Sequence, residues 1–96
     1  ARIEVQTKVS EEIKENLTDI QSEFLSTFGG YLTECQWTEE TIANLIRTVA
    51  SNLGIGSRDA YVSLYLIILG SNHGPKVSSI IFEIGKSGIL ELIETA

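Results

Sequence analysis

One short segment combines residue types that can hold an anion or a nucleic-acid base, and it reads Asn72-His73-Gly74-Pro75-Lys76. Lys76 supplies a cation, and the ring of His73 can stack on an unpaired base. Gly74 lets another backbone approach closely, and Pro75 suits the first position of a helix whose free amides can hold an anion. A simple turn between two helices explains the same residues equally well. The residues alone therefore leave a functional loop and a connecting turn as equal alternatives.

Residues for catalysis or metal binding are scarce. The chain has one cysteine, Cys35, and one histidine, His73, which excludes an intramolecular disulfide, a Cys-rich zinc site and most catalytic triads. Cys35 is interpreted as a small buried hydrophobe. Two glycine-rich stretches, 54–57 and 85–88, lack the spacing of a phosphate-binding loop and are interpreted as a helix end followed by a helix start. We expect no catalytic residue, no metal site and no cofactor in this domain.

Acidic residues concentrate in the first part of the chain. The formal net charge is −6, and residues 1–40 hold nine acids and three bases, whereas residues 41–96 hold four of each. The cluster of Glu11, Glu12, Glu15, Asp19 and Glu23 is interpreted as a solvated helix face. Carboxylates repel phosphate, so we expect the acidic helices to face away from any RNA. The cations expected on or near the binding side are Arg47, Arg58, Lys76 and Lys86.

The elements that must position these residues are predicted to be helices. Apolar residues recur at helical spacing in several segments, for example Ile42, Leu45, Ile46, Val49 and Leu53. The pattern predicts an all-α fold, a compact bundle of five or six helices that forms a single domain over residues 1–96. Tyr61 to Leu69 is apolar except for Ser63, so this element should be buried on nearly all sides. Its periodicity also allows a strand, but the signals before and after it favour a helix. Breaks are expected near Leu17, Gln36, Gly54–Gly56, Gly70–Gly74 and Gly85.

Small polar residues predict where the helices begin. The expected N-caps are Ser10, Thr18, Thr38, Ser57 and Ser87, and Pro75 is expected at the first position of a helix. Thr18 and Gln21 have the spacing of a capping box. Gly29 and Gly30 lie inside a helical pattern, where we expect either a kink or a close crossing of two helices.

The apolar runs are short. None approaches the ~20 residues that a membrane-spanning helix needs, and no basic and apolar leader opens the chain. We expect no membrane partner and a reducing, cytoplasmic location. The chain opens with Ala1 and not with methionine, so we expect a piece of a longer protein.

Three stretches near the C-terminus resemble a known family. They are Leu64-Tyr65-Leu66-Ile67-Ile68-Leu69-Gly70, Asn72-His73-Gly74-Pro75-Lys76, and Ile84-Gly85-Lys86 with Leu90 and Ile93. Together they resemble the C-terminal end of class I lysyl-tRNA synthetases, with an aromatic-aliphatic run ending in Gly, a Gly-Pro-basic loop and a Gly-Lys pair before a last apolar helix. The resemblance covers roughly residues 9–96 and is strongest over 58–93. Ser71-Asn72-His73 departs from the family pattern, in which charged residues are commoner there.

The resemblance implies a helical cage that binds the tRNA anticodon loop. Carried over by position, Gly74, Pro75, Lys76 and Val77 lie beside the last anticodon bases. Related glutamyl-tRNA synthetases carry an Arg at the position of Tyr65, which implies stacking here in place of a charged contact. The tRNA-binding residues expected on all these grounds are Tyr65, His73, Gly74, Pro75, Lys76, Val77, Arg58 and Lys86.

The parent enzyme implied by the resemblance ligates lysine to tRNA with ATP, on a catalytic domain that these residues do not include. No His-Ile-Gly-His or Lys-Met-Ser-Lys-Ser type signature occurs in them. The partners implied are the tRNA anticodon loop and the rest of the synthetase chain. Two alternatives stay open. The same fold could serve a glutamyl-tRNA synthetase, or the chain could be a helical protein–protein adaptor without an RNA role. An adaptor should expose an apolar groove, whereas an anticodon module should expose Lys76, His73 and a ring near one another.

Overall fold

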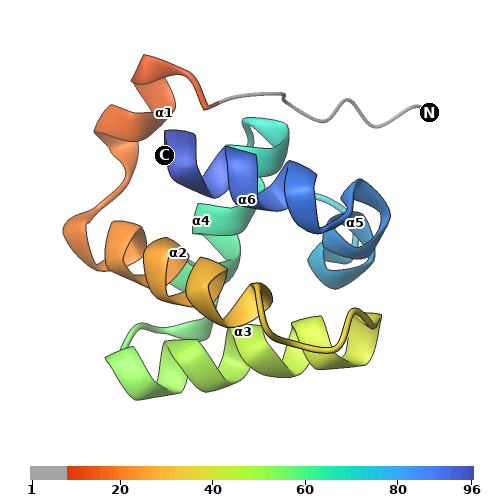
Figure 1. Cartoon of the computed structure of the whole chain (residues 1–96). Coiled ribbons are helices and arrows are strands. Elements are labelled where there is room, and N and C mark those ends of the chain that lie inside the picture. The colour runs from red at the N-terminus through yellow and green to blue at the C-terminus, as the bar shows by residue number, and fades with distance from the viewer. Residues whose placement is uncertain (1–8) are drawn as a thin grey trace.

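The computed structural model describes residues 9–96, which form six α-helices joined by short connections (Figure 1). In chain order these are α1 (Glu11–Asn16), α2 (Asp19–Leu32), α3 (Glu39–Leu53), α4 (Ser57–Leu69), α5 (Val77–Ile84) and α6 (Lys86–Thr95). The described residues contain no strand, and Tyr61 to Leu69 lies inside α4. The predicted all-α bundle is confirmed, and all five expected breaks fall between successive helices. Within residues 9–96, no helix is both long and apolar enough to cross a membrane.

Local chemistry explains most helix ends. The side chains of Ser10, Thr18 and Thr38 each accept a hydrogen bond from a backbone amide in the first turn of α1, α2 and α3. Thr18 and Gln21 form the complete capping box. α3 and α4 both end at a glycine with φ of 73°, Gly54 and Gly70, a left-handed conformation that costs other residues a steric clash.

Three predicted helix starts are wrong by one or two residues. Ser57 is the first residue of α4 and Gly56 precedes it as the cap, so no side chain accepts a hydrogen bond there. Ser87 lies inside α6, which begins at Lys86 after Gly85. Pro75 lies two residues before α5, and Lys76 occupies the cap position. A cap preference is worth only about 1 kcal/mol, which is too little to fix a helix boundary to the exact residue.

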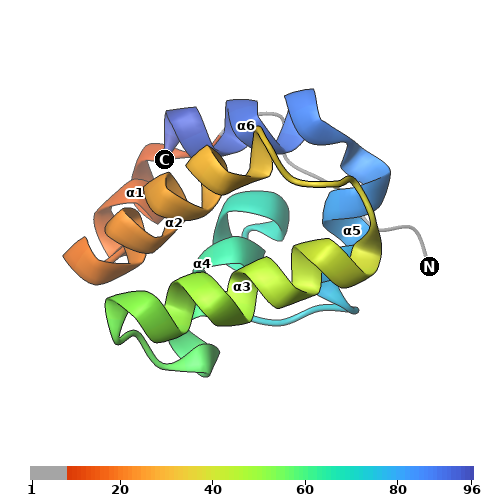
Figure 2. The same ribbon diagram turned by 60° about the horizontal axis from the view of Figure 1, so that its bottom comes forward.

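α4 runs through the middle of the bundle, and α2, α3, α5 and α6 pack around it (Figures 1 and 2). One side of α4 is fully buried and carries Ala60, Leu64, Ile67 and Ile68. On another side Tyr61 and Tyr65 are only half-buried. The expectation that this element is enclosed on nearly all sides is therefore too strong, and its open side lines the groove described below.

The Gly29-Gly30 pair marks a close crossing and not a helix end. α2 continues through both glycines to Leu32. A β-carbon placed on Gly29 would lie 3.2 Å from Cγ2 of Ile93 in α6, whereas one on Gly30 would meet nothing within 4 Å. Gly29 thus lets α6 approach α2 closely, which is one of the two outcomes that the sequence predicted.

Candidate functional site

The open side of α4 faces a groove of about 990 Å³. One wall is the face of α3 that carries Glu39, Ala43 and Arg47, and the other is α4 from Arg58 to Tyr65. The loop after α4 and the first turn of α5 close one end. From these, the lining residues are Asn72, His73, Gly74, Lys76, Val77 and Ser78.

Most of the predicted binding residues meet in this groove. Six of the eight line it, namely Arg58, Tyr65, His73, Gly74, Lys76 and Val77. Pro75 connects two of them, and its carbonyl oxygen accepts a hydrogen bond from a groove residue. Lys86 does not line it. The fold therefore brings together residues that lie up to 19 positions apart in the sequence, Arg58 and Val77.

Tyr65 fixes the loop against α4. Its hydroxyl donates a hydrogen bond to the carbonyl oxygen of Pro75 at 2.7 Å. Burial raises the pKa of this hydroxyl, the neighbouring Tyr61 raises it further, and a hydrogen bond with the backbone of Val77 lowers it. The phenol is therefore neutral at physiological pH and able to donate. Tyr65 thus lines the groove, as the stacking expected from the sequence would require, and its hydroxyl also holds the loop.

A glycine at position 74 is required by contacts inside the protein itself. A β-carbon on this residue would lie 2.6 Å from Cδ1 of Leu69 and 3.3 Å from Cε1 of Tyr65. Such distances force at least one side chain to move. The close approach that the sequence predicted at Gly74 is thus already made inside the protein, by the two side chains beneath the loop. No ligand is needed to explain the glycine.

Lys76 occupies the entrance of the groove, at the start of α5. It is exposed and takes the N-cap position without a side-chain hydrogen bond to the first turn. The next two residues, Val77 and Ser78, are buried and also line the groove. The positive end of the helix dipole and the ammonium group therefore favour an anion at the same place.

Both signs of charge line the groove. Arg47 projects from α3 and hydrogen-bonds Asn44, and Arg58 projects from the start of α4. Glu39 and Glu40 lie in the first turn of α3, where Glu39 accepts a hydrogen bond from Ser79 of α5. The site can thus bind a short stretch of polyanion at its cationic positions, but Glu39 and Glu40, which lie beside the start of α5, limit how much phosphate it tolerates.

Sequence reasoning missed the two carboxylates. Glu39 and Glu40 lie in the first turn of α3, where their charges also suit the helix dipole. The spacing of Glu39, Ala43 and Arg47 places the three on one helix face, and that periodicity was the available signal. The sequence could not show that this face of α3 would form a groove with α4 and the loop, because that depends on how the helices pack.

Lys86 lies at a different place, beside the connection from α2 to α3. Its ammonium nitrogen donates to the carbonyl oxygen of Thr33 at 3.2 Å and lies 5.8 Å from the ring centre of Trp37. Lys86, expected on or near the binding side, thus lies outside the groove. Arg47, Arg58 and Lys76 do share the groove.

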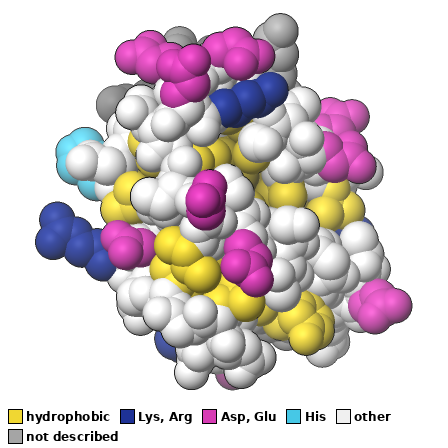
Figure 3. All heavy atoms as spheres, turned by 90° about the vertical axis from the view of Figure 1, so that its left-hand side faces the viewer, with side chains coloured by type: hydrophobic (Ala, Val, Ile, Leu, Met, Phe, Trp, Pro, Cys, Tyr) yellow, Lys and Arg dark blue, Asp and Glu magenta, His cyan; other side chains and the backbone are white. Residues whose placement is uncertain are grey.

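The acidic helices behave as the charge pattern predicted. Glu11, Glu12 and Glu15 line no part of the groove. Figure 3 shows the side of the molecule on which the first helices lie, where carboxylates surround small apolar areas. Among residues 9–96, no three His, Cys, Asp or Glu side chains gather closely enough to hold a metal ion.

Comparisons with known proteins point in one direction. Residues 2–96 match the family model described as an anticodon binding domain. A lysine–tRNA ligase of Methanocaldococcus jannaschii is 32% identical over 84% of this chain and 15% of its own length. One from Archaeoglobus fulgidus is 30% identical over 96% of this chain and 18% of its own length. A glutamate–tRNA ligase of Delftia acidovorans is 26% identical over 84% of this chain and 17% of its own length. No solved structure matches. The chain thus spans about one sixth of the length of these relatives.

Proposed function

This chain belongs to the anticodon-binding domain family of aminoacyl-tRNA synthetases, and from that premise we propose that its groove binds the anticodon loop of a lysine tRNA. One observation carries the proposal: Lys76, His73 and the ring of Tyr65 line a single groove. A cation, a stackable imidazole and an aromatic edge are the groups with which proteins hold unpaired RNA bases. An adaptor surface would expose an apolar groove in their place.

The mechanism we propose is recognition without chemistry. Unstacked anticodon bases enter the groove between α3 and α4, with a phosphate at Lys76 and the start of α5. Arg47 and Arg58, the other two cations of the groove, contact further phosphates of the RNA backbone. Glu39 and Glu40 accept hydrogen bonds from base or ribose donors and repel additional phosphates, which restricts the groove to a few nucleotides. Binding by the chain alone is weak, because contacts to the rest of the tRNA belong to other domains.

The reaction of the whole enzyme is proposed from the relatives. They are named as ligases of lysine or glutamate to tRNA, and this chain corresponds to a small part of each. We propose that it is one domain of a longer lysine–tRNA ligase acting in the cytoplasm, with ATP and lysine bound elsewhere in that protein. Tyr65, in the position where the glutamyl branch carries an Arg, favours lysine over glutamate.

A binding titration tests the proposal. A fluorescein-labelled, uridine-rich anticodon stem-loop is titrated with the chain, and a stem-loop with the glutamate anticodon is titrated in parallel. Lys76→Ala is expected to weaken binding by about 1–3 kcal/mol if the ammonium contacts a base. If it contacts a phosphate, the slope of log K against log salt falls by about 0.7.

Lys14→Ala is the matched control, because Lys14 lies on α1, pairs with Glu11 at 3.8 Å in the same helix and does not line the groove. It should leave the affinity unchanged. Equal affinity of the folded Lys76→Ala variant and the wild type removes the loop from the binding site. Stronger binding of the glutamate stem-loop would replace lysine with glutamate in the proposal.

A further inference from the structure

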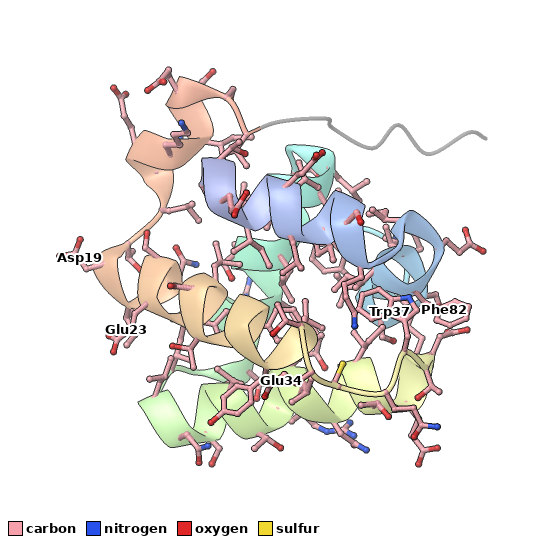
Figure 4. All side chains as sticks on the ribbon, viewed as in Figure 1. Asp19, Glu23, Glu34, Trp37 and Phe82 are labelled. Carbon is pink, nitrogen blue, oxygen red and sulfur yellow. The ribbon has the colours of Figure 1, made fainter. Side chains whose placement is uncertain are left out.

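Two aromatic residues lie outside the groove, where the connection between α2 and α3 meets α5 (Figure 4). The indole nitrogen of Trp37 donates to the carbonyl oxygen of Phe82 at 3.2 Å. Neither residue lines the groove. This hydrogen bond to the Phe82 backbone fixes the indole of Trp37 against α5 before any ligand arrives.

The Phe82 ring is unusually open to solvent. It is 40% exposed, although α5 offers a core into which Val77, Ile80 and Ile81 are buried. Trp37 is half-buried beside it. Lys86 reaches over Trp37, with 5.8 Å between the ammonium and the ring centre, and the carbonyl oxygen of Thr33 anchors it at 3.2 Å. An exposed ring, a fixed ring and an anchored cation therefore share one surface.

We propose that Phe82, Trp37 and Lys86 form a platform for one unpaired nucleobase of the bound RNA, stacked on Phe82 with its phosphate at Lys86. The inference rests on the proposed function. A flat aromatic face next to a cation is the arrangement on which single-stranded nucleic acids stack. Two rings are far too small for a stable protein interface, which buries roughly 800 Å² on each partner.

Local charge restricts the ligand to a single nucleotide. Glu83 follows Phe82 directly and is exposed, and Glu34 follows the Thr33 carbonyl that holds Lys86. These carboxylates oppose a run of phosphates passing over the platform. An uncharged base over Phe82, with one phosphate near Lys86, avoids them.

The platform is rigidly connected to the groove. α5 begins in the groove with Val77 and carries Phe82 five residues later, about 7.5 Å further along the helix axis. The hydrogen bond between Ser79 and Glu39 ties α5 to the start of α3 between the two places. The groove and the platform are therefore joined through one helix, α5, and through its contact with α3.

Intrinsic fluorescence tests the platform without any mutation, because Trp37 is the one tryptophan in the chain. An unlabelled anticodon stem-loop is added while Trp37 emission is recorded, and anisotropy of a labelled stem-loop measures binding independently. We expect Trp37 emission to change along the same binding curve.

Variants supply the second measurement. Phe82→Ala is expected to weaken binding about 5- to 150-fold, and Phe82→Tyr should bind like the wild type because the stacking face remains. Lys86→Gln should lower the salt slope by about 0.7. Tyr31→Ala is the matched control, since Tyr31 is another exposed ring, 52% exposed on α2, and does not line the groove.

The outcomes separate this inference from the proposed function. If the labelled stem-loop binds but Trp37 emission stays constant and Phe82→Ala keeps the wild-type affinity, the platform is wrong and the groove remains. If the wild type does not bind the stem-loop at all, the proposed function fails and the platform fails with it.

Discussion

The hydroxyl of Tyr65 in α4 donates to the carbonyl oxygen of Pro75 at 2.7 Å, across ten positions of sequence. This bond connects the central helix to the loop that carries His73, Gly74 and Lys76. The geometry of the candidate site thus depends on a side chain from the core-forming helix, and the first predictions concern this bond.

Tyr65→Phe should loosen the loop while keeping the ring. Removing the hydroxyl leaves the Pro75 carbonyl to water, which should lower the free energy of unfolding by about 1 kcal/mol. Affinity for the anticodon stem-loop should also fall, because Lys76 is positioned less well. Urea unfolding and anisotropy measure the two effects, and stem-loop binding at wild-type strength would show that the bond is structural only.

Alkaline pH should destabilise the wild type through the same hydroxyl. Its pKa is raised in the folded state by burial and by Tyr61, so above the ordinary phenol pKa of about 10 the unfolded chain releases this proton first. The contribution of Tyr65 is therefore fully present below pH 10 and declines as the pH rises further. Unfolding measured between about pH 8 and 11 should show a smaller decline for Tyr65→Phe. Tyr31→Phe, at an exposed position, should retain the wild-type decline.

Gly74→Ala should strain the loop, because the new methyl group would press against side chains of α4. The new β-carbon would meet Leu69 at 2.6 Å and the Tyr65 ring at 3.3 Å, so a cost of about 1–3 kcal/mol in stability is expected. In a Leu69→Ala background the nearer contact is gone, and the cost of Gly74→Ala should shrink. A double-mutant cycle by urea unfolding measures this coupling. Additive effects would mean that the loop moves away freely.

The two adjacent glycines of α2 should respond differently to alanine. Gly30→Ala should stabilise the protein by about 1 kcal/mol, because its β-carbon meets nothing and the helix gains propensity. At Gly29 the same gain is opposed by Ile93 at 3.2 Å in α6. Thermal unfolding of both variants checks the difference, and an equal rise in Tm would contradict the close crossing.

Gln21 should contribute more to the free energy of unfolding than a residue that only caps a helix. Its side-chain oxygen accepts from the Thr18 amide at 3.0 Å, and its side-chain nitrogen donates to the Asp59 carbonyl oxygen at 3.1 Å, which joins the starts of α2 and α4. Because Gln21 is buried, Gln21→Ala removes a hydrogen-bond partner from both the Thr18 amide and the Asp59 carbonyl. The free energy of unfolding should therefore fall by about 1–3 kcal/mol. Ser22→Ala, on the exposed side of α2, is the control. A loss confined to a few tenths of a kcal/mol would show that water replaces both bonds.

The sequence by itself determined the all-α class, a bundle of five or six helices with approximate limits, and the family. Thr18, Thr38, Gly54 and Gly70 act on backbone groups within a few residues, so their effect can be read from neighbouring positions. It also indicated the loop from 72 to 76, because cations and glycine between apolar helices are a local pattern. Ser57, Pro75 and Ser87 show the limit, since each helix begins one or two residues from the start that these residues predicted.

Only the tertiary structure decided which of these residues share a site. Arg47 and Lys76 meet in one groove, whereas Lys86, equally basic and only ten positions after Lys76, lies over Trp37. The hydrogen bond from Tyr65 to Pro75 and the contacts beneath Gly74 were likewise beyond the sequence. The physical reason is that helical periodicity fixes how side chains are arranged around one axis. The face that each helix turns toward another is set by the packing of all six together.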